Sequence, residues 1–436
     1  MEYDLRNGAG GTCGAEGGTT MEYRPRIADS ELSSRLKSTG AVLIEGPKAC
    51  GKTATARTQA ASEVRLDVDA QQRAAAEVTP DLVLDQPAPL LIDEWQLVPD
   101  IWAHVRRAVD DRAARGQFIL TGSATPNDEA ARHSGAGRIG VMRMRPMCLA
   151  EAGSSTAAVS LDRLLDGATQ NAQDSGLSVV GLAQLIAKGG WPGLLDDDAP
   201  TALQSLRDYL TQVSHVDVPV VSGKRRDPVK VGALLRSLAR NTATEVAITT
   251  LAADAADSGG TLDRDSASAY LAALDRLMVI EDQPAWSPAL RSRVQLRSSP
   301  RRHFVDPSLA VAALRASPER LLADLESMGL LFESMVIRDL RVLSQPLGGR
   351  VLHYRDNKGL EVDAIVVCED GRWGAFEVKL GSGRIDDAAE NLLAFTKKVD
   401  TSVCGEPGVL AVVTGTGLAY RRKDGVHVVP IGTLGP

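Results

Sequence analysis

Cysteine is scarce in this sequence, and long uncharged apolar runs are missing. Five cysteines are scattered over 436 residues without CxxC spacing, which argues against a disulfide framework and against a zinc site. No apolar run approaches the roughly 18 to 20 residues of a membrane-spanning helix. The N-terminus carries acids and glycines instead of a basic and then apolar leader. We therefore expect a soluble cytoplasmic protein with reduced thiols and no membrane partner.

Neither sign of charge is in large excess. The 49 lysines and arginines against 56 acids give a net charge of -7, so any contact with DNA would have to come from local basic patches. Hydrophobic residues at 44% and charged residues at 24% exclude wholesale disorder, collagen-like repeats and a coiled-coil rod. At about 100 to 200 residues per domain, the length suggests about two to four domains.

The N-terminal third alternates between helical and strand patterns. Residues 1–20 are rich in glycine and threonine without apolar periodicity, and we predict a disordered tail there. Residues 21–150 place apolar runs between helical patterns, which is typical of a parallel sheet with helices on both faces. The expected strands are residues 41–45, 64–68, 89–92 and 118–121, and the expected helices run from residue 52 and over residues 102–115.

Two further parts follow. Strand signals are sparse in residues 151–325, where helical patterns such as 229–240 and 266–277 dominate. Strands return in residues 326–436 around a helix predicted at 387–397. We therefore predict an α/β chain with a helical middle and a second α/β domain at its end.

Residues Gly46 to Thr53 match the phosphate-loop pattern GxxxxGK[ST] between an apolar strand and a helix, the context that this motif requires. Backbone N–H groups and the helix N-terminus would hold phosphates, Lys52 would reach the β- and γ-oxygens, and Thr53 would ligate Mg²⁺. This predicts a site for ATP and Mg²⁺. The residues assigned to nucleotide binding are Gly46, Pro47, Lys48, Ala49, Cys50, Gly51, Lys52 and Thr53.

Two acids, Asp93 and Glu94, end the apolar strand that follows the phosphate-loop unit. Asp93 would hold the magnesium through water, and Glu94 would polarise the attacking water as general base. A kinase would not need a glutamate placed in this way, so the pair favours hydrolysis. The alternative is a solvated strand end without catalytic meaning.

Thr121, Gly122 and Ser123 close the next strand. They put hydroxyls where a γ-phosphate sensor lies in additional-strand ATPases, and Ser123 therefore joins Glu94 and Lys52 among the predicted catalytic residues. The alternative is a simple turn from strand to loop.

Several segments together resemble a known family, the AAA+-like prokaryotic ATPases of uncharacterised role. The resemblance covers nearly the whole chain from residue 21. It implies a P-loop AAA+-like ATPase core, a helical or winged-helix middle and a C-terminal fold like the PD-(D/E)xK nucleases. The segments that carry it are residues 23–27 (Tyr-Arg-Pro-Arg-Ile), the phosphate loop, and residues 93–96, 118–123 and 137–139.

The resemblance also implies roles for two other segments. In such ATPases an arginine from a neighbouring subunit can complete the site, and Arg138 is the candidate, which would make the protein a homo-oligomer. A surface arginine, or one that faces the phosphates of its own subunit, is the alternative. Residues 189–192 (Gly-Gly-Trp-Pro) resemble the GxP signature that packs near adenine in related switch ATPases, although glycine followed by proline also simply ends helices.

Basic residues flank a helix-and-wing pattern in the middle part. Residues 266–277 are predicted as the helix, and residues 302–306 as part of the wing. Such clusters could neutralise DNA phosphates, but charge runs are usually solvated faces, and winged helices also act as structural lids. DNA is therefore a candidate partner. The basic residues are Lys224, Arg225, Arg226, Arg291, Arg293, Arg297, Arg301 and Arg302.

Acids and a lysine in the last part follow the order E, D, ExK. Glu333 lies on an apolar helix, Asp363 on a strand, and Glu377 and Lys379 at the end of the next strand. In an antiparallel pair of strands, Asp363 and Glu377 can converge on a metal, while Lys379 shares the face of Glu377 and can activate water. The alternatives are a surface pair of Glu377 with Lys379, or a fold kept for binding after catalysis is lost.

The sequence thus predicts an ATPase whose nucleotide state controls a nuclease-like, DNA-directed module. The rival hypothesis is a nucleotide-gated regulator, or a binding protein of toxin–antitoxin type, without nuclease chemistry. A separate expectation concerns Cys50, which lies in the phosphate loop near two lysines and a helix N-terminus, where a reactive thiolate shielded by ATP is favoured. In the alternative, its side chain points away from the phosphates.

Overall fold

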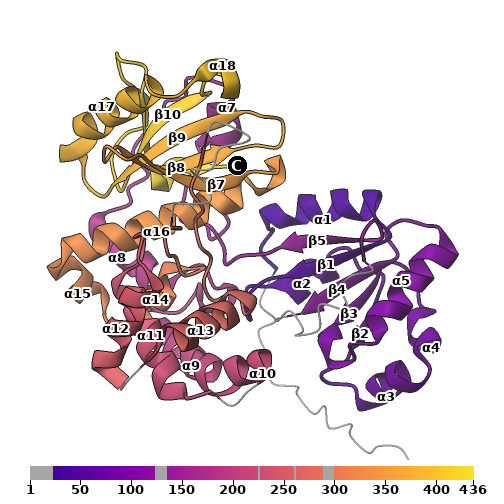
Figure 1. Cartoon of the computed structure of the whole chain (residues 1–436). Coiled ribbons are helices and arrows are strands. Elements are labelled where there is room, and N and C mark those ends of the chain that lie inside the picture. Colours follow the sequence, from indigo (N-terminus) through magenta and orange to yellow (C-terminus); the bar gives the residue numbers. More distant parts are fainter. Residues whose placement is uncertain (1–22, 123–134, 224–225, 260–261, 288–298) are drawn as a thin grey trace, which may run out of the picture.

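The computed structural model shows three parts, coloured from indigo to yellow in Figure 1. Within the described part of the chain, no helix is both long and apolar enough to cross a membrane. The predicted tail, residues 1–20, lies outside the described residues. These are residues 23–122, 135–223, 226–259, 262–287 and 299–436.

The N-terminal unit is a parallel sheet with the strand order β2-β3-β4-β1-β5. Alternate residues of a strand face opposite sides, so Leu43 packs with Val105 on one face and Ile44 packs with Leu32 on the other. The predicted parallel sheet with helices on both faces is confirmed. Its elements are α1 (Ile27–Ser38), β1 (Ala41–Glu45), α2 (Lys52–Arg57), β2 (Ser62–Arg65), α3 (Ala70–Val78), α4 (Pro80–Leu84), β3 (Leu90–Asp93), α5 (Ile101–Arg112), β4 (Phe118–Gly122) and β5 (Ile139–Arg143).

Two strands differ from the expectation. β2 ends at Arg65, earlier than the predicted range 64–68, and Val68 beyond it is exposed. β5 has no counterpart in the prediction, because only Ile139 and Met142 of its five residues are buried at this edge of the sheet. The sequence Ile-Gly-Val-Met-Arg is short and interrupted by a glycine, so it gives a weak strand signal.

The middle part is helical, as predicted, and its helices bury their apolar stripes against one another. The predicted helices at 229–240 and 266–277 correspond to α11 and α13 within one or two residues. The helices are α8 (Val179–Lys188), α9 (Ala199–Gln212), α10 (Val218–Ser222), α11 (Pro228–Arg240), α12 (Ile248–Gly259), α13 (Arg264–Arg276), α14 (Pro307–Ala313) and α15 (Pro318–Ala323).

The C-terminal unit is a mixed sheet with the order β11-β12-β10-β9-β8-β7. β7, β8 and β9 are antiparallel neighbours, whereas β10 runs parallel to β9. The long helix α16 packs on one face and α17 on the other. The elements are α16 (Leu325–Leu343), β7 (Arg350–Arg355), β8 (Glu361–Val367), β9 (Trp373–Lys379), α17 (Ile385–Thr396), α18 (Thr401–Cys404), β10 (Val409–Thr414), β11 (Tyr420–Arg421), β12 (His427–Pro430) and β13 (Leu434–Gly435).

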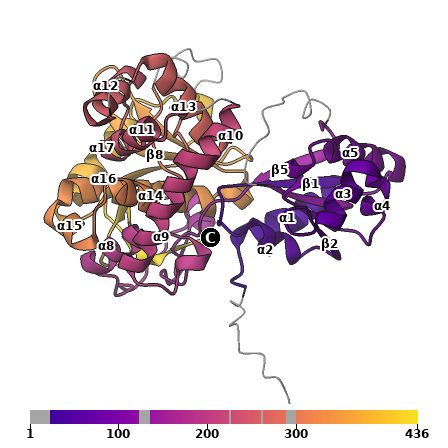
Figure 2. The same ribbon diagram turned by 90° about the horizontal axis from the view of Figure 1, so that it is seen from below.

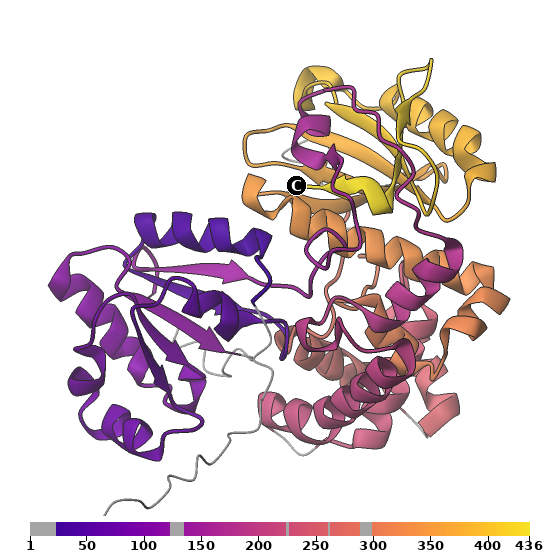
Figure 3. The same ribbon diagram turned by 180° about the vertical axis from the view of Figure 1, so that it is seen from behind.

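A segment that precedes the helical middle lies against the C-terminal unit, over the yellow sheet in Figure 3. β6 (Val159–Ser160) pairs in parallel with β13, and Asp162 of α7 (Leu161–Leu165) forms an ion pair with Arg372. The range 151–325 expected for the middle therefore contains a segment that belongs with the last part. No local sequence pattern reveals this long-range pairing.

The middle and C-terminal parts share one continuous apolar core, while the N-terminal unit has cores of its own. Figure 2 accordingly shows the N-terminal unit to one side of the other two parts. A buried ion pair crosses this boundary: Arg145 donates hydrogen bonds to both carboxylate oxygens of Glu281, at 2.7 and 2.8 Å. The N-terminal unit is thereby tied to the rest of the chain.

Candidate nucleotide site and a second carboxylate cluster

The phosphate loop joins β1 to α2, and its glycines are required by the backbone. A Cβ at Gly46 would lie 2.5 Å from the carbonyl oxygen of Met144 and 2.9 Å from Cys50 Sγ, closer than real Cβ atoms come. Gly51, which precedes α2, has a φ of 101°, in the left-handed region that favours glycine. The fold thus requires glycine at both positions of the motif.

Lys52 and Thr53 open α2 and face the loop. Lys52 Nζ donates to the carbonyl oxygens of Gly46 at 3.0 Å and Pro47 at 2.8 Å, so its ammonium lies where phosphates would be held. Thr53 Oγ1 donates to Asp93 Oδ1 at 2.9 Å. A hydroxyl and a carboxylate that converge in this way fit Mg²⁺, which takes few protein oxygens and completes its shell with water and phosphate.

Glu94 lies next to this pair, at the end of β3. Its φ of 55° is unusual for a residue with a side chain, and Gln96 Nε2 donates to its carboxylate. Burial raises the pKa of Glu94. A cavity of about 650 Å³ brings Glu94 and Gln96 together with Lys52 and Thr53. Sequence reasoning assigns no role to Gln96, although its position two residues after Glu94 is a usable signal.

A neighbouring cavity of about 730 Å³ adjoins the same loop. Its lining includes Tyr23, Ala54, Met147 and Pro192, and Pro192 Cγ lies 3.5 Å from where a Cβ of Gly51 would be. The structure therefore places the segment that resembles the GxP signature beside the phosphate loop. The lining also includes the charged residues Arg24, Arg26 and Asp196, and the apolar part of the cavity can accept a flat aromatic base.

The loop also contacts the helical middle. Lys48 Nζ lies 2.6 Å from Asp217 Oδ1, and Asp217 belongs to a π-helical turn, η3 (Val213–Asp217), that continues α9. Asp217 is buried, whereas Lys48 is half-exposed. Lys48 is thus held by a partner outside the N-terminal unit.

The third predicted element, Thr121 to Ser123, requires a correction. Thr121 is fully buried and its hydroxyl donates to Asp93, so it supports the carboxylate of Asp93 and is not free to meet a γ-phosphate. Ser123 lies outside the described residues, and its role as a sensor stays a prediction.

Arg138 lies at the end of the sheet opposite the phosphate loop. Its carbonyl accepts from the N–H of Ala41, where β1 begins, while the loop follows Glu45, where β1 ends. Its half-exposed side chain pairs with Asp110 at 2.8 Å. The option that Arg138 faces the phosphates of its own subunit is therefore wrong, because the length of β1 separates them. The option of a neighbouring subunit stays a prediction.

The expectation that Cys50 carries an accessible thiol is wrong. Cys50 is 0% exposed and packs with Ile44 and Met142 under the loop. Its side chain points into the core because the loop turns its backbone groups outward toward the phosphate position. Arg26 fixes that arrangement by donating to the Cys50 carbonyl at 2.9 Å.

The four residues of the E, D, ExK pattern meet in the C-terminal unit. Glu333 comes from α16, Asp363 from β8, and Glu377 and Lys379 from β9. Lys379 Nζ lies 2.7 Å from Glu377 Oε2 and 3.3 Å from Asp363 Oδ2. The structure thus brings these side chains together, while their convergence on a metal stays a prediction. We call these residues, together with Arg301, the carboxylate cluster.

Arg301 enters this cluster from the segment between α13 and α14 of the helical middle. Its Nη1 lies 2.7 Å from Glu333 and 3.1 Å from Asp363, and its Nη2 lies 3.0 Å from Glu361. The side chain is only 6% exposed. Its backbone is fixed by two hydrogen bonds with Gln283 at 2.9 and 3.0 Å.

The cluster has strongly perturbed protonation. Burial, and then repulsion from Asp363, raises the pKa of both Glu333 and Glu377. Burial opposes ionisation of Asp363 as well, yet Lys379 and Arg301 hold its pKa below the ordinary value. The two cations therefore stabilise Asp363 as a carboxylate at the centre of the cluster. In the described part of the chain, no group of three or more acidic, histidine or cysteine side chains is arranged to hold a metal ion.

The expected basic face of the middle part needs a correction. Arg301 is buried among carboxylates, and Arg302 pairs with Asp282, so neither can neutralise DNA phosphates in this conformation. Lys224, Arg225, Arg291, Arg293 and Arg297 lie outside the described residues. Two isolated antiparallel bridges, Ile280–Phe304 and Gln283–Arg301, stand where the wing was expected.

Comparison with family models divides the chain in three. Residues 38–153 match an AAA domain, residues 180–320 match a domain of unknown function (DUF8612), and residues 328–434 match another domain of unknown function (DUF4143). The first match supports an AAA-type ATPase domain with the phosphate loop described above.

Curated relatives include uncharacterised proteins of Mycobacterium bovis and Mycobacterium tuberculosis. Each is 27% identical over 375 residues, which are 82% of this chain and 74% of the relative.

Solved structures show weaker likeness. A Walker-type ATPase of Pyrococcus abyssi is 12% identical with a TM-score of 0.41, over 67% of this chain and 99% of its own. A DNA replication initiation factor is 13% identical with a TM-score of 0.22, over 57% and 86%. The Drosophila origin recognition complex bound to DNA is 13% identical with a TM-score of 0.21, over 72% and 96%. These scores are too low to establish a common overall fold.

Proposed function

We propose that the protein binds and hydrolyses ATP with Mg²⁺ at the phosphate loop. The observation that carries this proposal is the hydrogen bond of 2.9 Å from Thr53 Oγ1 to Asp93 Oδ1. Lys52 and Glu94 line the same cavity. The AAA-domain match over residues 38–153 supports the same reading.

Each residue would have a distinct part in hydrolysis. Lys52 and the loop N–H groups bind the β- and γ-phosphates, and the cavity lined by Tyr23 and Pro192 takes the adenine. Mg²⁺, held through Thr53 and Asp93, would supply charge neutralisation on the phosphate oxygens. Glu94 accepts a proton from the attacking water, and Gln96 holds the Glu94 carboxylate in place.

The test is phosphate release by the full chain with and without Mg²⁺, in the wild type and in Lys52→Ala. We expect Mg²⁺-dependent release that Lys52→Ala abolishes. The matched control is Lys37→Ala, which removes an exposed lysine at the end of α1 and should leave the rate unchanged. No release by the wild type, or equal release by Lys52→Ala, would refute the proposal.

For the C-terminal unit we propose a nuclease-like module whose substrate is a phosphodiester such as DNA. The support is the convergence of Asp363, Glu377 and Lys379, together with a cavity of about 540 Å³ that reaches Glu333 and Lys379. Arg384 is exposed at this cavity, where it could meet a phosphate. The E, D, ExK order on one helix and two antiparallel strands agrees with the resemblance drawn from the sequence.

A specific observation favours the rival function, a nucleotide-gated binding module without cleavage. Arg301 already provides the cation between Glu333 and Asp363, so these two carboxylates share an internal counter-ion. Plasmid incubated with ATP and Mn²⁺ decides between the two. Cleavage that Asp363→Ala and Lys379→Ala abolish, with ATP hydrolysis unchanged, supports the nuclease. No cleavage by a protein that hydrolyses ATP supports the rival.

A further inference from the structure

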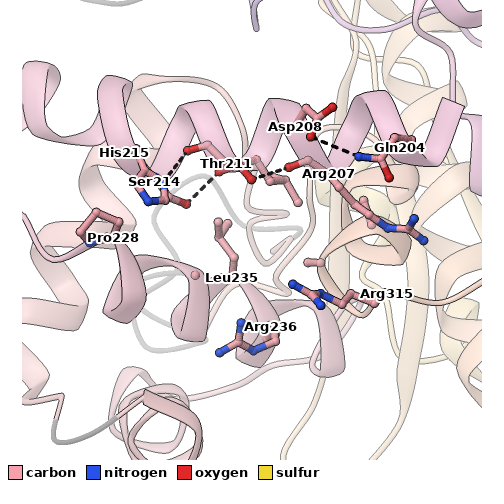
Figure 4. A pocket seen from close by; sticks show the side chains of 14 residues that line it. Gln204, Arg207, Asp208, Thr211, Ser214, His215, Pro228, Leu235, Arg236 and Arg315 are labelled. Carbon is pink, nitrogen blue, oxygen red and sulfur yellow. Dashed lines mark hydrogen bonds between the residues drawn. The ribbon is translucent and has the colours of Figure 1, made fainter. Parts of the chain in front are cut away.

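A cavity of about 620 Å³ lies within the helical middle and shares no lining residue with the cavities at the phosphate loop or beside the carboxylate cluster. Three arginines from three elements line it: Arg207 of α9, Arg236 of α11, and Arg315 just after α14. Figure 4 shows Arg236 and Arg315 near each other on one side of the cavity, across from α9. The lining is therefore strongly cationic.

The positive charge in this cavity is not balanced. Within the described residues, Arg236 and Arg315 have no side-chain hydrogen bond or ion pair, and the buried Nε of Arg207 has no partner. Asp208, the one acid in the lining, lies 3.3 Å from the Gln204 amide. Arg207 and Arg236 are partly buried and Arg315 is exposed, and in the described part of the chain Arg207 Nη2 donates only to the carbonyl oxygen of Ala316 at 3.5 Å. Neighbouring guanidinium groups without a counter-ion repel one another, so a bound anion would stabilise them.

The backbone at Arg315 adds an independent observation. Its φ is 52°, in the left-handed region where a glycine would meet no strain. An arginine at this position therefore carries a conformational cost that a glycine would not. This turn places Arg315 in the lining of the cavity, near Arg236 and across from α9.

One helix connects the cavity to the phosphate loop. Thr211 of α9 and His215 of η3 line the cavity, and Asp217, which ends the same π-helical turn, pairs with Lys48 at 2.6 Å. π-Helical turns often occur at functional sites, because the wider turn is held only by its context. A ligand that binds to Thr211 or His215 would therefore shift Asp217 and change its contact with Lys48.

We propose that this arginine cavity binds a small phosphate-bearing anion and that its occupancy alters nucleotide binding at the phosphate loop. Planar guanidinium forks match phosphate oxygens in pairs, Gln204 and Thr211 add polar groups, and the volume lies in the range of small-molecule sites. The site is independent of the proposed ATPase activity, whereas the coupling rests on ATP binding at the loop.

The binding test uses inorganic pyrophosphate as the probe and isothermal titration of the full chain saturated with Mg²⁺ and a non-hydrolysable ATP analogue, so that the phosphate loop is filled. We expect one site in the wild type. Arg236→Gln combined with Arg315→Gln should weaken it at least about tenfold, the cost of about 1.4 kcal/mol of lost interaction. The matched control is Arg240→Gln, since Arg240 lies one turn further along α11 and pairs on the surface with Asp254.

Three results would overturn the site: no pyrophosphate binding by the wild type at millimolar concentration, equal binding by the double variant, or loss of binding in Arg240→Gln as well. A single-stranded 12-mer oligonucleotide is titrated in parallel. If the oligonucleotide binds through Arg236 and Arg315 while pyrophosphate does not, the ligand is a nucleic acid and the small-molecule assignment is wrong.

The coupling is tested by the release rate of a fluorescent ATP analogue during a chase, with and without pyrophosphate. We expect at least a twofold change in the wild type, and no change in Asp217→Asn or in the double arginine variant. An unchanged release rate in the wild type would refute the coupling. Failure of the fluorescent analogue to bind at all would instead refute the proposed nucleotide site.

Discussion

Arg301 Nη1 lies 2.7 Å from Glu333 Oε1, so an arginine from the middle part contacts the acid that opens the E, D, ExK pattern. The same nitrogen reaches Asp363 at 3.1 Å. A guanidinium and a divalent cation compete for the same carboxylate oxygens, because an oxygen that accepts hydrogen bonds from Arg301 is not available to bind a metal ion. We therefore expect the cluster to hold either Arg301 or a metal, but not both.

Arg301→Gln should expose this competition. We expect Mn²⁺ affinity measured by titration to rise at least about tenfold over the wild type, because Glu333 and Asp363 lose their internal counter-ion. Arg301→Gln combined with Asp363→Asn should bring the affinity back to the wild-type level. Circular dichroism and ATP hydrolysis check that the variant is folded. A folded Arg301→Gln variant with unchanged Mn²⁺ affinity would show that the cluster is not a metal site.

Glu94→Gln should separate nucleotide binding from turnover. The amide keeps the shape and the contact with Gln96 but cannot accept a proton, so we expect ATP affinity to remain while turnover falls about 10²- to 10⁴-fold. Binding is followed by fluorescence of an ATP analogue, and turnover by phosphate release. Glu77→Gln is the matched control, since Glu77 is exposed on α3. A Glu94→Gln variant with wild-type turnover would exclude Glu94 as the general base.

Arg138→Ala distinguishes a neighbouring-subunit role from a surface role. If Arg138 completes the site of a partner, turnover should fall by about 10³-fold or more with unchanged nucleotide affinity, and mixing with Glu94→Gln should restore part of it. Asp110→Ala is the control, because it removes the partner of Arg138 at 2.8 Å but leaves the arginine. A monomer by light scattering with ATP present, and wild-type turnover by Arg138→Ala, would defeat this role.

The sequence predicts the phosphate loop and its strand well because the motif is contiguous and local rules govern it. β1 has the predicted bounds of Ala41–Glu45, and the loop glycines take the conformations that the motif requires. The order E, D, ExK also anticipated the carboxylate cluster, because two adjacent antiparallel strands set the positions of Asp363 and Glu377.

The sequence did not predict contacts between distant segments. Arg301 lies 62 residues before Asp363 in the chain, and its run of neighbouring basic residues pointed to a solvated or DNA-binding face. The burial of Arg301 does not follow from that pattern, because the three carboxylates that compensate for it belong to distant segments. The arginine cavity was missed for the same reason, since Arg207, Arg236 and Arg315 belong to no common motif.

The carboxylate cluster should also give a pH-dependent stability. Burial raises the pKa of Glu333 above its ordinary value near 4.5, so the folded chain holds this proton more tightly than the unfolded chain. Its contribution to stability is therefore present at low pH and is lost as the pH rises through the raised pKa. We expect Glu333→Gln, which mimics the protonated acid, to have a Tm that falls less than that of the wild type between pH 5 and pH 9. Parallel Tm curves for the two proteins would contradict this assignment.

Alkylation should label Cys404 before the other cysteines of the described residues. Cys50, Cys148 and Cys368 are buried, while Cys404 at the end of α18 is partly exposed. Burial raises the pKa of Cys404, so labelling should be slow near neutral pH and faster as the pH rises, because the thiolate is the reactive form. Since Cys404 lies in the C-terminal unit, Mg²⁺ and ATP should not change its rate, and Cys404→Ser should remove the modified peptide. Peptide mapping after brief treatment with iodoacetamide measures the extent of labelling at each cysteine. Rapid labelling of Cys50 that ATP prevents would show that the phosphate loop opens far enough to expose the side chain that the structure buries.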